Sequence, residues 1–243
     1  MLRLLSYNVH DLLDDADAVA HVVRSCRPDV ACLQEVPRRS VTGRRVRRLA
    51  RETGLRWTAG GRGSGGTAVF TSPRVDVLAA SAGRLPVAGP FTRTRGYALA
   101  RLSGLTVVSV HLPLRAAERV AHAELVLDVL RGQPQPWVVA GDLNEPPDGA
   151  AWSVFGTALL DAFGGTPAGR LAPGRAEPGA PASGLTYPAR APRRRIDAVL
   201  VSPGADVERC VVAGADEHLS PADLQAASDH LPVLVDLRLN SPA

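Results

Sequence analysis

The stretch "AASDHLPVLVDLRL", residues 226–239, contains two features that decide the fold. Its second half, from Val233 to Leu239, is an apolar run of strand length. Its first half places a carboxylate, Asp229, beside an imidazole, His230, immediately before that strand. Polar groups at the edge of a core lose solvation unless other groups compensate them. The rest of the sequence therefore has to supply partners for this pair.

Apolar runs of the same kind recur along the chain. They predict strands at residues 2–9, 29–34, 66–71, 74–79, 97–102, 105–112, 137–142, 196–201 and 232–239. Several are apolar nearly throughout, which is typical of strands buried on both faces of a layered sheet. Apolar residues at helical spacing predict helices around 19–26, 46–53 and 120–130, the last of them ended by Gly132 and Pro134.

The composition is that of a soluble globular protein. Of 243 residues, 45% are hydrophobic and 21% are charged. A stretch rich in Pro and Gly at 164–192 predicts a long surface loop. Strand patterns needed for one sheet lie on both sides of it, so we predict a single domain over residues 1–243. No apolar run reaches the length of a membrane span and no signal peptide is evident, which predicts a cytoplasmic location, with a monomer favoured.

The basic residues are all arginine, and they give a net charge of +4. This charge suits a partner that carries phosphate, including nucleic acid. A solvated basic surface, in a protein encoded by a GC-rich genome, is the more common explanation for most of these side chains. Three cysteines without short paired spacings argue against a disulfide framework or a zinc knuckle.

Polar residues gather where the predicted strands end or begin, which is where sites form on layered sheets. Each has an ordinary explanation by itself, such as a solvated loop acid, a core histidine, an Asx turn or an ion pair. Their joint occurrence at strand ends is harder to explain by turn chemistry. The residues are Asn8, Glu35, His111, Asp142, Asn144, Asp197, Asp229 and His230.

Taken in order, "YNVH", "LQE", "SVHL", "GDLN", "RID" and "SDH" resemble the endonuclease/exonuclease/phosphatase superfamily, over residues 6–236. Its members include DNase I-like nucleases, abasic-site endonucleases, inositol-polyphosphate phosphatases and neutral sphingomyelinases. The resemblance implies an α/β (α+β) fold, a four-layer α/β/β/α sandwich of two mixed sheets flanked by helices. It also implies hydrolysis of phosphate esters assisted by Mg²⁺ or Mn²⁺, with one or two ions.

The resemblance also implies roles for individual residues. Asn8, Glu35 and Asp229 match the metal environment, whose oxygen ligands suit a hard cation better than zinc. His230 would point at the scissile phosphate, and Asp197 would hydrogen-bond the other nitrogen of its ring. His111 and Asn144 would donate hydrogen bonds to phosphate oxygens. Asp142 and His230 are both candidates for activating water.

The substrate is less well defined. A phosphodiesterase of nuclease type is the leading interpretation. A phosphomonoester or a phospholipid headgroup is the alternative, and a non-catalytic binding module is disfavoured because no site residue is missing. Several nuclease members carry an acid where this chain has His10, which either lines the pocket or faces solvent. Arg193, Arg194 and Arg195 directly precede a site strand, and they either contact substrate phosphates or are solvated loop charges.

Overall fold

A computed structural model describes residues 1–38, 42–87, 89, 93–164 and 184–239. Most of the predicted Pro/Gly-rich loop, residues 165–183, lies outside these ranges. Its described end, 184–192, contains no helix or strand, and Tyr187 forms an isolated bridge with Arg194. No helix in the described ranges is both long enough and apolar enough to cross a membrane. The single domain and the cytoplasmic location stay predictions.

The first sheet has six strands in the order β11-β12-β1-β2-β4-β3. Only the β1–β2 pair is parallel, and the other four pairs are antiparallel. The strands are β1 (Leu2–Asn8), β2 (Val30–Gln34), β3 (Arg56–Gly60), β4 (Ala68–Thr71), β11 (Ala205–Val212) and β12 (Val233–Leu239).

The second sheet also has six strands, in the order β5-β6-β7-β8-β10-β9. Again one pair, β7–β8, is parallel and the other four are antiparallel. The strands are β5 (Val77–Arg84), β6 (Gly96–Leu102), β7 (Leu105–His111), β8 (Trp137–Asp142), β9 (Leu160–Asp161) and β10 (Asp197–Val201).

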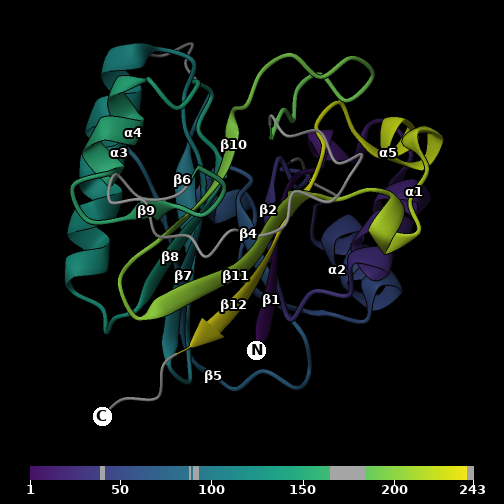
Figure 1. Cartoon of the computed structure of the whole chain (residues 1–243), viewed down its shortest axis with the longest axis horizontal. Coiled ribbons are helices and arrows are strands. Elements are labelled where there is room, and N and C mark those ends of the chain that lie inside the picture. Colours follow the sequence, from purple (N-terminus) through teal and green to yellow (C-terminus); the bar gives the residue numbers. More distant parts are fainter. Residues whose placement is uncertain (39–41, 88, 90–92, 165–183, 240–243) are drawn as a thin grey trace.

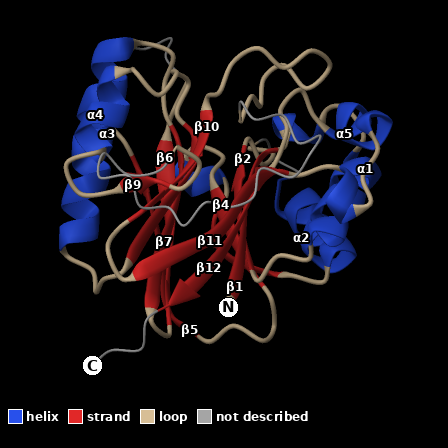
Figure 2. Cartoon of the chain, in the orientation of Figure 1, coloured by secondary structure: helices blue, strands red, loops and turns tan. Residues whose placement is uncertain are grey.

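Helices cover the outer face of each sheet (Figures 1 and 2). On the first sheet these are α1 (Ala16–Cys26), α2 (Thr42–Thr53) and α5 (Pro221–Ala227). On the second they are α3 (Ala116–Arg131) and α4 (Ala150–Phe155). Short 3-10 helices lie at His10–Leu12, Arg62–Ser64 and Ala215–Glu217.

Three apolar clusters fill the spaces between these layers. One joins the first sheet to its helices, one joins the second sheet to its helices, and one lies between the sheets. The inter-sheet cluster takes side chains such as Cys32 and Val107 from the central strands. The predicted four-layer α/β/β/α sandwich with two mixed sheets is therefore confirmed.

Local sequence explains where the helices begin and what they bury. In α1 the Asp15 side chain accepts hydrogen bonds from the backbone of Asp17 and Ala18, and the predicted apolar face is buried. At α5, Ser220 and Asp223 form a capping box and Pro221 occupies the first turn.

The strand ends that carry the predicted site residues meet at one edge of the two sheets. His111 lies opposite Asp142 in the parallel β7–β8 pair, and Asp142 lies opposite Asp197 in the β8–β10 pair. Asn8 ends β1 opposite Gln34 at the end of β2. The topology therefore brings side chains from distant parts of the sequence to one place.

Candidate active site

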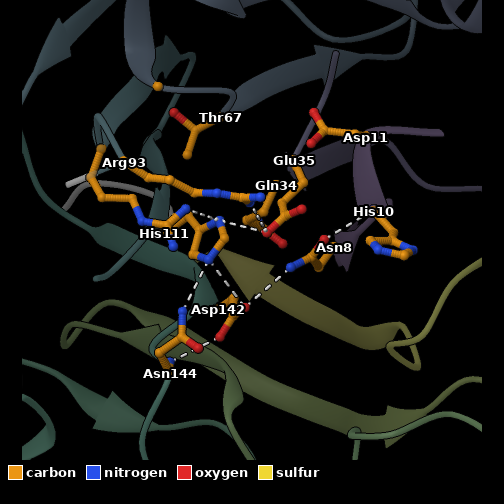
Figure 3. A network of polar contacts seen from close by, with 12 residues as sticks. Asn8, His10, Asp11, Gln34, Glu35, Thr67, Arg93, His111, Asp142 and Asn144 are labelled. Atoms are coloured by element: carbon orange, nitrogen blue, oxygen red, sulfur yellow. Dashed lines mark hydrogen bonds and ion pairs between the residues drawn. The ribbon is translucent and has the colours of Figure 1, made fainter. Parts of the chain in front are cut away.

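A buried carboxylate, Asp142, lies at the centre of the polar network at this edge (Figure 3). Its Oδ2 accepts a hydrogen bond from Asn8 Nδ2 at 3.1 Å and lies 3.3 Å from His111 Nε2. Its Oδ1 accepts a bond of 2.9 Å from the backbone N–H of Asn144. Two strands, β1 and β7, and the loop after β8 thus fix the orientation of this carboxylate.

The histidine of the Asp229–His230 pair finds its partner in Asp197. Nδ1 of His230 lies 2.9 Å from Asp197 Oδ2, although the two residues are far apart in sequence. Because a carboxylate only accepts, this bond places a proton on Nδ1 and turns Nε2 towards Asp142 Oδ2, 3.8 Å away. Ser228 supports the turn, since its hydroxyl donates to the Asn8 carbonyl oxygen and accepts from the His230 backbone N–H.

The tautomer of His111 follows from its partner Arg95. Arg95 Nη1 lies 3.1 Å from His111 Nδ1, and a guanidinium can only donate. Nδ1 is therefore the acceptor, and the proton of the neutral ring is on Nε2, which faces the acceptor Asp142 Oδ2 at 3.3 Å. With this tautomer the 3.0 Å approach of Asn144 Nδ2 to Nε2 is a contact between two donors and not a hydrogen bond. Burial and then the charge of Arg95 keep the pKa of His111 well below its usual value, so the ring is neutral. His111 thus presents an N–H donor towards Asp142.

Asn144 adds a second donor at the same point. Its Nδ2 donates to the Leu112 carbonyl oxygen at 2.9 Å and lies 3.0 Å from His111 Nε2. A positive φ of 55° at Asn144 turns the side chain back towards the sheet edge. Two N–H groups that converge in this way can both donate to one oxyanion.

Glu35 lies on the other side of His111, just beyond β2. Its Oε1 is 3.8 Å from His111 Nδ1 and 3.9 Å from Arg93 Nη1. Its φ of 52° turns it out of the strand direction, and its side chain is largely covered. Glu35 and Asp142 therefore lie around the same imidazole (Figure 3).

His10 and Asp229 lie at the more exposed margin. The His10 backbone N–H donates to Asn8 Oδ1 at 3.1 Å, and its Nδ1 lies 2.8 Å from Asp14 Oδ2 and 3.9 Å from Asp229 Oδ1. The His10 side chain is 36% exposed. It is therefore both a neighbour of the site and partly solvated, which combines the two alternatives raised by the sequence.

A family model, that of the Endonuclease/Exonuclease/phosphatase family, matches residues 5–230. The chain belongs to this family. The match covers nearly the whole described fold, including every strand end that carries a polar site residue. A search of curated proteins found no match.

Several solved structures share the fold. An endonuclease/exonuclease/phosphatase from Bacteroides vulgatus superposes with a TM-score of 0.74 at 19% identity, covering 98% of this chain and 99% of that one. A mannosyl-6-phosphatase from Bacteroides thetaiotaomicron gives 0.72 at 19% identity, covering 98% and 100%. The human nocturnin catalytic domain gives 0.66 at 18% identity, covering 98% and 94%.

Burial and neighbouring charges set the pKa values of the titratable groups in this cluster. Burial and the charge of Asp197 raise the pKa of Asp142 to about 7. Burial alone would lower the pKa of His230, but the charge and hydrogen bond of Asp197 outweigh it and raise the pKa to about 10. Without a metal ion, His230 is therefore an imidazolium near neutral pH.

One group of acidic and histidine side chains within the described ranges could hold a metal ion. The ligand atoms of Asp142, Asp197 and His230 lie within 4.8 Å of one another, and all three residues are buried. Oδ1 of Asp197 is buried without a hydrogen-bond partner, as a ligand atom awaiting a cation would be. Glu35 and Asp229, the acids that the sequence resemblance assigns to the metal, lie outside this group.

The three arginines before β10 are not equivalent. Arg195 Nη2 is bound to Asp161 Oδ2 at 2.6 Å, and its guanidinium lies 5.0 Å from the ring centre of Trp152. Its side chain is only 13% exposed, so it is part of the packing between β9 and α4. Arg193 and Arg194 are exposed.

Four side chains of this region were not predicted from the sequence: Arg38, Arg93, Arg95 and Tyr187. Tyr187 packs against His230 with ring centroids 4.8 Å apart. Arg95 lies directly before β6, so it is a polar residue at a strand end, like the residues that the sequence predicted. It was missed because it matches none of the family motifs.

Proposed function

We propose that this protein is a Mg²⁺- or Mn²⁺-dependent phosphodiesterase of nuclease type. The observation that carries the proposal is the convergence on Asp142 of Asn8, His111, Asn144 and the Asp197–His230 pair. A phosphodiester is anionic and repels hydroxide, so its hydrolysis needs a proton acceptor, N–H donors and a cation in one place.

The chemistry of the donor set fits a hard cation. Carboxylate and amide oxygens dominate the site, and none of the three cysteines belongs to the group that could hold a metal ion. We propose Glu35, with Asn8 and Asp229, as one position for the ion, and Asp142 with Asp197 as a second, so one or two ions would be held. When bound, the ion would neutralise the non-bridging oxygens of the phosphate.

Side chains of this chain would carry the proton transfers. Asp142 is the acceptor placed among donors, and with an ion at the Glu35 position alone we assign it the proton of the attacking water as the new O–P bond forms. His111 Nε2–H and Asn144 Nδ2–H would donate to a phosphate oxygen as its charge grows. His230, held by Asp197, would donate to the oxygen that leaves as its bond to phosphorus breaks.

We propose that Arg193 and Arg194 contact phosphates flanking the scissile one, because they are exposed and lead into β10. Arg195 is held by Asp161 and serves packing instead. A nucleic acid strand is therefore the proposed substrate class.

A panel of substrates tests the proposal: a nucleic acid strand, a chromogenic phosphodiester and a set of phosphomonoesters, each with Mg²⁺. We expect hydrolysis of the diesters, abolished by EDTA and lowered by orders of magnitude in Glu35→Gln. Titration should show weaker Mg²⁺ binding in that variant, because one negative charge is lost while the shape is kept. Undiminished Mg²⁺ affinity would remove Glu35 from the metal position, and turnover of monoesters alone would replace the diesterase with a phosphatase.

A further inference from the structure

Three arginines, Arg38, Arg93 and Arg95, lie close enough to His111 for each of their charges to lower the pKa of its ring. Arg38 follows β2, and Arg93 and Arg95 precede β6, so the guanidinium groups come from two separate loops. Arg93 Nη1 lies 3.9 Å from Glu35 Oε1, and Figure 3 shows its side chain directed towards Glu35 and His111. None of the proposed chemical steps uses these arginines.

Arg95 is a buried cation with no carboxylate of the described residues at ion-pair distance. It is 5% exposed, and the partner of its Nη1 is the neutral ring of His111. Its Nε is buried and has no hydrogen-bond partner within the described part of the chain. A buried charge in this state is costly, and an anion placed nearby would offset the cost.

The other two arginines are also weakly compensated. Arg38 Nη1 donates to the carbonyl oxygens of Gly65 and Thr94 at a long 3.4 Å, and its nearest carboxylate is Asp11 at 3.9 Å. Arg93 is 64% exposed yet reaches inward to Glu35. Charge-assisted bonds to a carboxylate are usually about 2.7–2.9 Å, so these contacts leave donors available. A cation bound by Glu35 would also neutralise the carboxylate that lies closest to Arg93.

His111 separates this cluster from the reaction centre. Its Nδ1 faces Arg95 and Glu35, whereas its Nε2 faces Asp142 and Asn144. A group bound by the arginines would therefore lie on the opposite side of the imidazole from the water-activating carboxylate. Such a group is held in place, not attacked.

We propose that Arg38, Arg93 and Arg95 form a second oxyanion site, which binds a non-reacting phosphate of the substrate. The inference rests on the proposed function and sharpens it, because the preferred substrate then carries a phosphate beside the scissile one. Arg38 and Arg93 contact that phosphate, and the buried Arg95 supplies a fixed positive charge beside it.

A binding measurement tests the site without turnover. We expect the EDTA-treated protein to bind inorganic diphosphate in a calorimetric titration, and Arg38→Gln/Arg93→Gln to weaken that binding at least about tenfold, the loss of one charge-assisted bond. The matched control is Arg51→Gln/Arg131→Gln, which removes the same charge from exposed positions on α2 and α3 and should cost about twofold or less. Equal affinity in the wild type and the first variant, or an equal loss in the control, would overturn the proposal.

A kinetic comparison separates this proposal from the proposed function. The substrates are the p-nitrophenyl ester of thymidine 5′-phosphate with and without a 3′-phosphate. We expect wild-type kcat/KM to favour the 3′-phosphorylated ester, and Arg38→Gln/Arg93→Gln to reduce that preference about tenfold. An equal fall of kcat on both esters would place the arginines on the reacting phosphate and refute the second site. Failure of the wild type on both esters would refute the diesterase, while the diphosphate titration would still decide the second site.

Discussion

The two sheets are built alike but carry different chemistry. In each, a central parallel pair joined by a helix, β1–α1–β2 or β7–α3–β8, is flanked on both sides by antiparallel strands. The next segments also correspond, because α2, β3 and β4 follow β2 as α4, β9 and β10 follow β8. The hairpins β11–β12 and β5–β6 complete the correspondence.

The register makes the comparison residue by residue. Asn8 and His111 end the first parallel strand of each half, opposite Gln34 and Asp142 respectively. Continuing the β2–β4 register by one residue places Thr67 opposite Gln34, where the other half has Asp197 opposite Asp142.

The difference between the halves lies in charge. One half has an amide facing a hydroxyl, and the other has two carboxylates at the same places. Two adjacent buried carboxylates repel each other and raise each other's pKa, so a second such pair across the sheets would be costly without more cations. The two halves therefore share one backbone arrangement, and they differ in the side chains that this arrangement brings together.

The largest effect on activity is expected at the Asp197–His230 pair, which joins the two sheets. We expect His230→Ala to lower kcat/KM about 10³- to 10⁴-fold, and Asp197→Asn about 10²-fold, because the second change leaves a misoriented imidazole in place. Thr67→Ser, at the counterpart of Asp197, should change it by less than about twofold. Steady-state kinetics on a chromogenic diester measure all three, and an equally damaging Thr67→Ser would show that both halves are chemically active.

The pH dependence of the free energy of unfolding should show that the buried carboxylate of Asp142 is destabilising when it is charged. With its pKa raised, Asp142 favours folding while protonated, and that contribution is lost as pH rises from about 4 to about 7. Asp142→Asn should remove this loss. In EDTA at pH 8, the variant should therefore have a higher free energy of unfolding than the wild type, by up to about 4 kcal/mol. Denaturant unfolding from pH 4 to 8 measures the difference. Parallel pH curves for the two proteins would contradict the assignment.

The segments that lead into β4 and β10 should also differ. Gly65 precedes β4 with a φ of 66°, and a Cβ at this position would lie 2.6 Å from the Thr94 carbonyl oxygen, whereas the other half has Arg195 before β10. We expect Arg195→Gln to lower the free energy of unfolding by about 2–4 kcal/mol, because it leaves the partly buried Asp161 carboxylate without its ion-pair partner, with only the Phe163 backbone N–H still donating to it. A loss below about 0.5 kcal/mol would contradict its role in packing.

The smallest effect should come from the exposed neighbours of Arg195. Arg193→Gln/Arg194→Gln should raise KM a few-fold on a nucleic acid strand and leave kcat and stability nearly unchanged. The log–log salt dependence should become shallower by roughly 0.7 to 0.9 per lost phosphate contact. If KM and the salt slope do not move, these arginines are solvated charges and not part of the substrate surface.

Sequence patterns predicted the buried strands well and the short or exposed elements poorly. Uniformly apolar β7 and β8 were found almost to the residue. The helix expected at 120–130 ends where predicted but begins four residues earlier, at Ala116. The unpredicted strands are β3, which is half-exposed, β9, which has two residues, and β11, whose bulge between Val207 and Arg209 breaks the alternation. β5 was expected at 74–79 but occupies Val77–Arg84, because its small exposed residues give no apolar signal.

The short helices and the site show the same limit. α4 and α5 have six and seven residues, too few for a helical period, although the Ser220–Asp223 capping box could have revealed α5. The expectation that polar residues gather at strand ends selected Asp142, Asp197 and His230, and the structure brings their ligand atoms within 4.8 Å of one another. Their roles stay predictions. The sequence did not distinguish Arg195 from Arg193, because only the fold places Asp161 beside Arg195.

The termini of the chain meet in the first sheet, where β12 lies between β11 and β1. All strands of the second sheet lie in one stretch of chain, from Val77 to Val201, whereas the first sheet is complete only with β12, Val233–Leu239. During synthesis from the N-terminus, the acidic half can therefore pair its strands while the other half is still open. Asp229 and His230 arrive with the final strand, so a nascent or prematurely terminated chain would hold Asp142 and Asp197 without the imidazole between them.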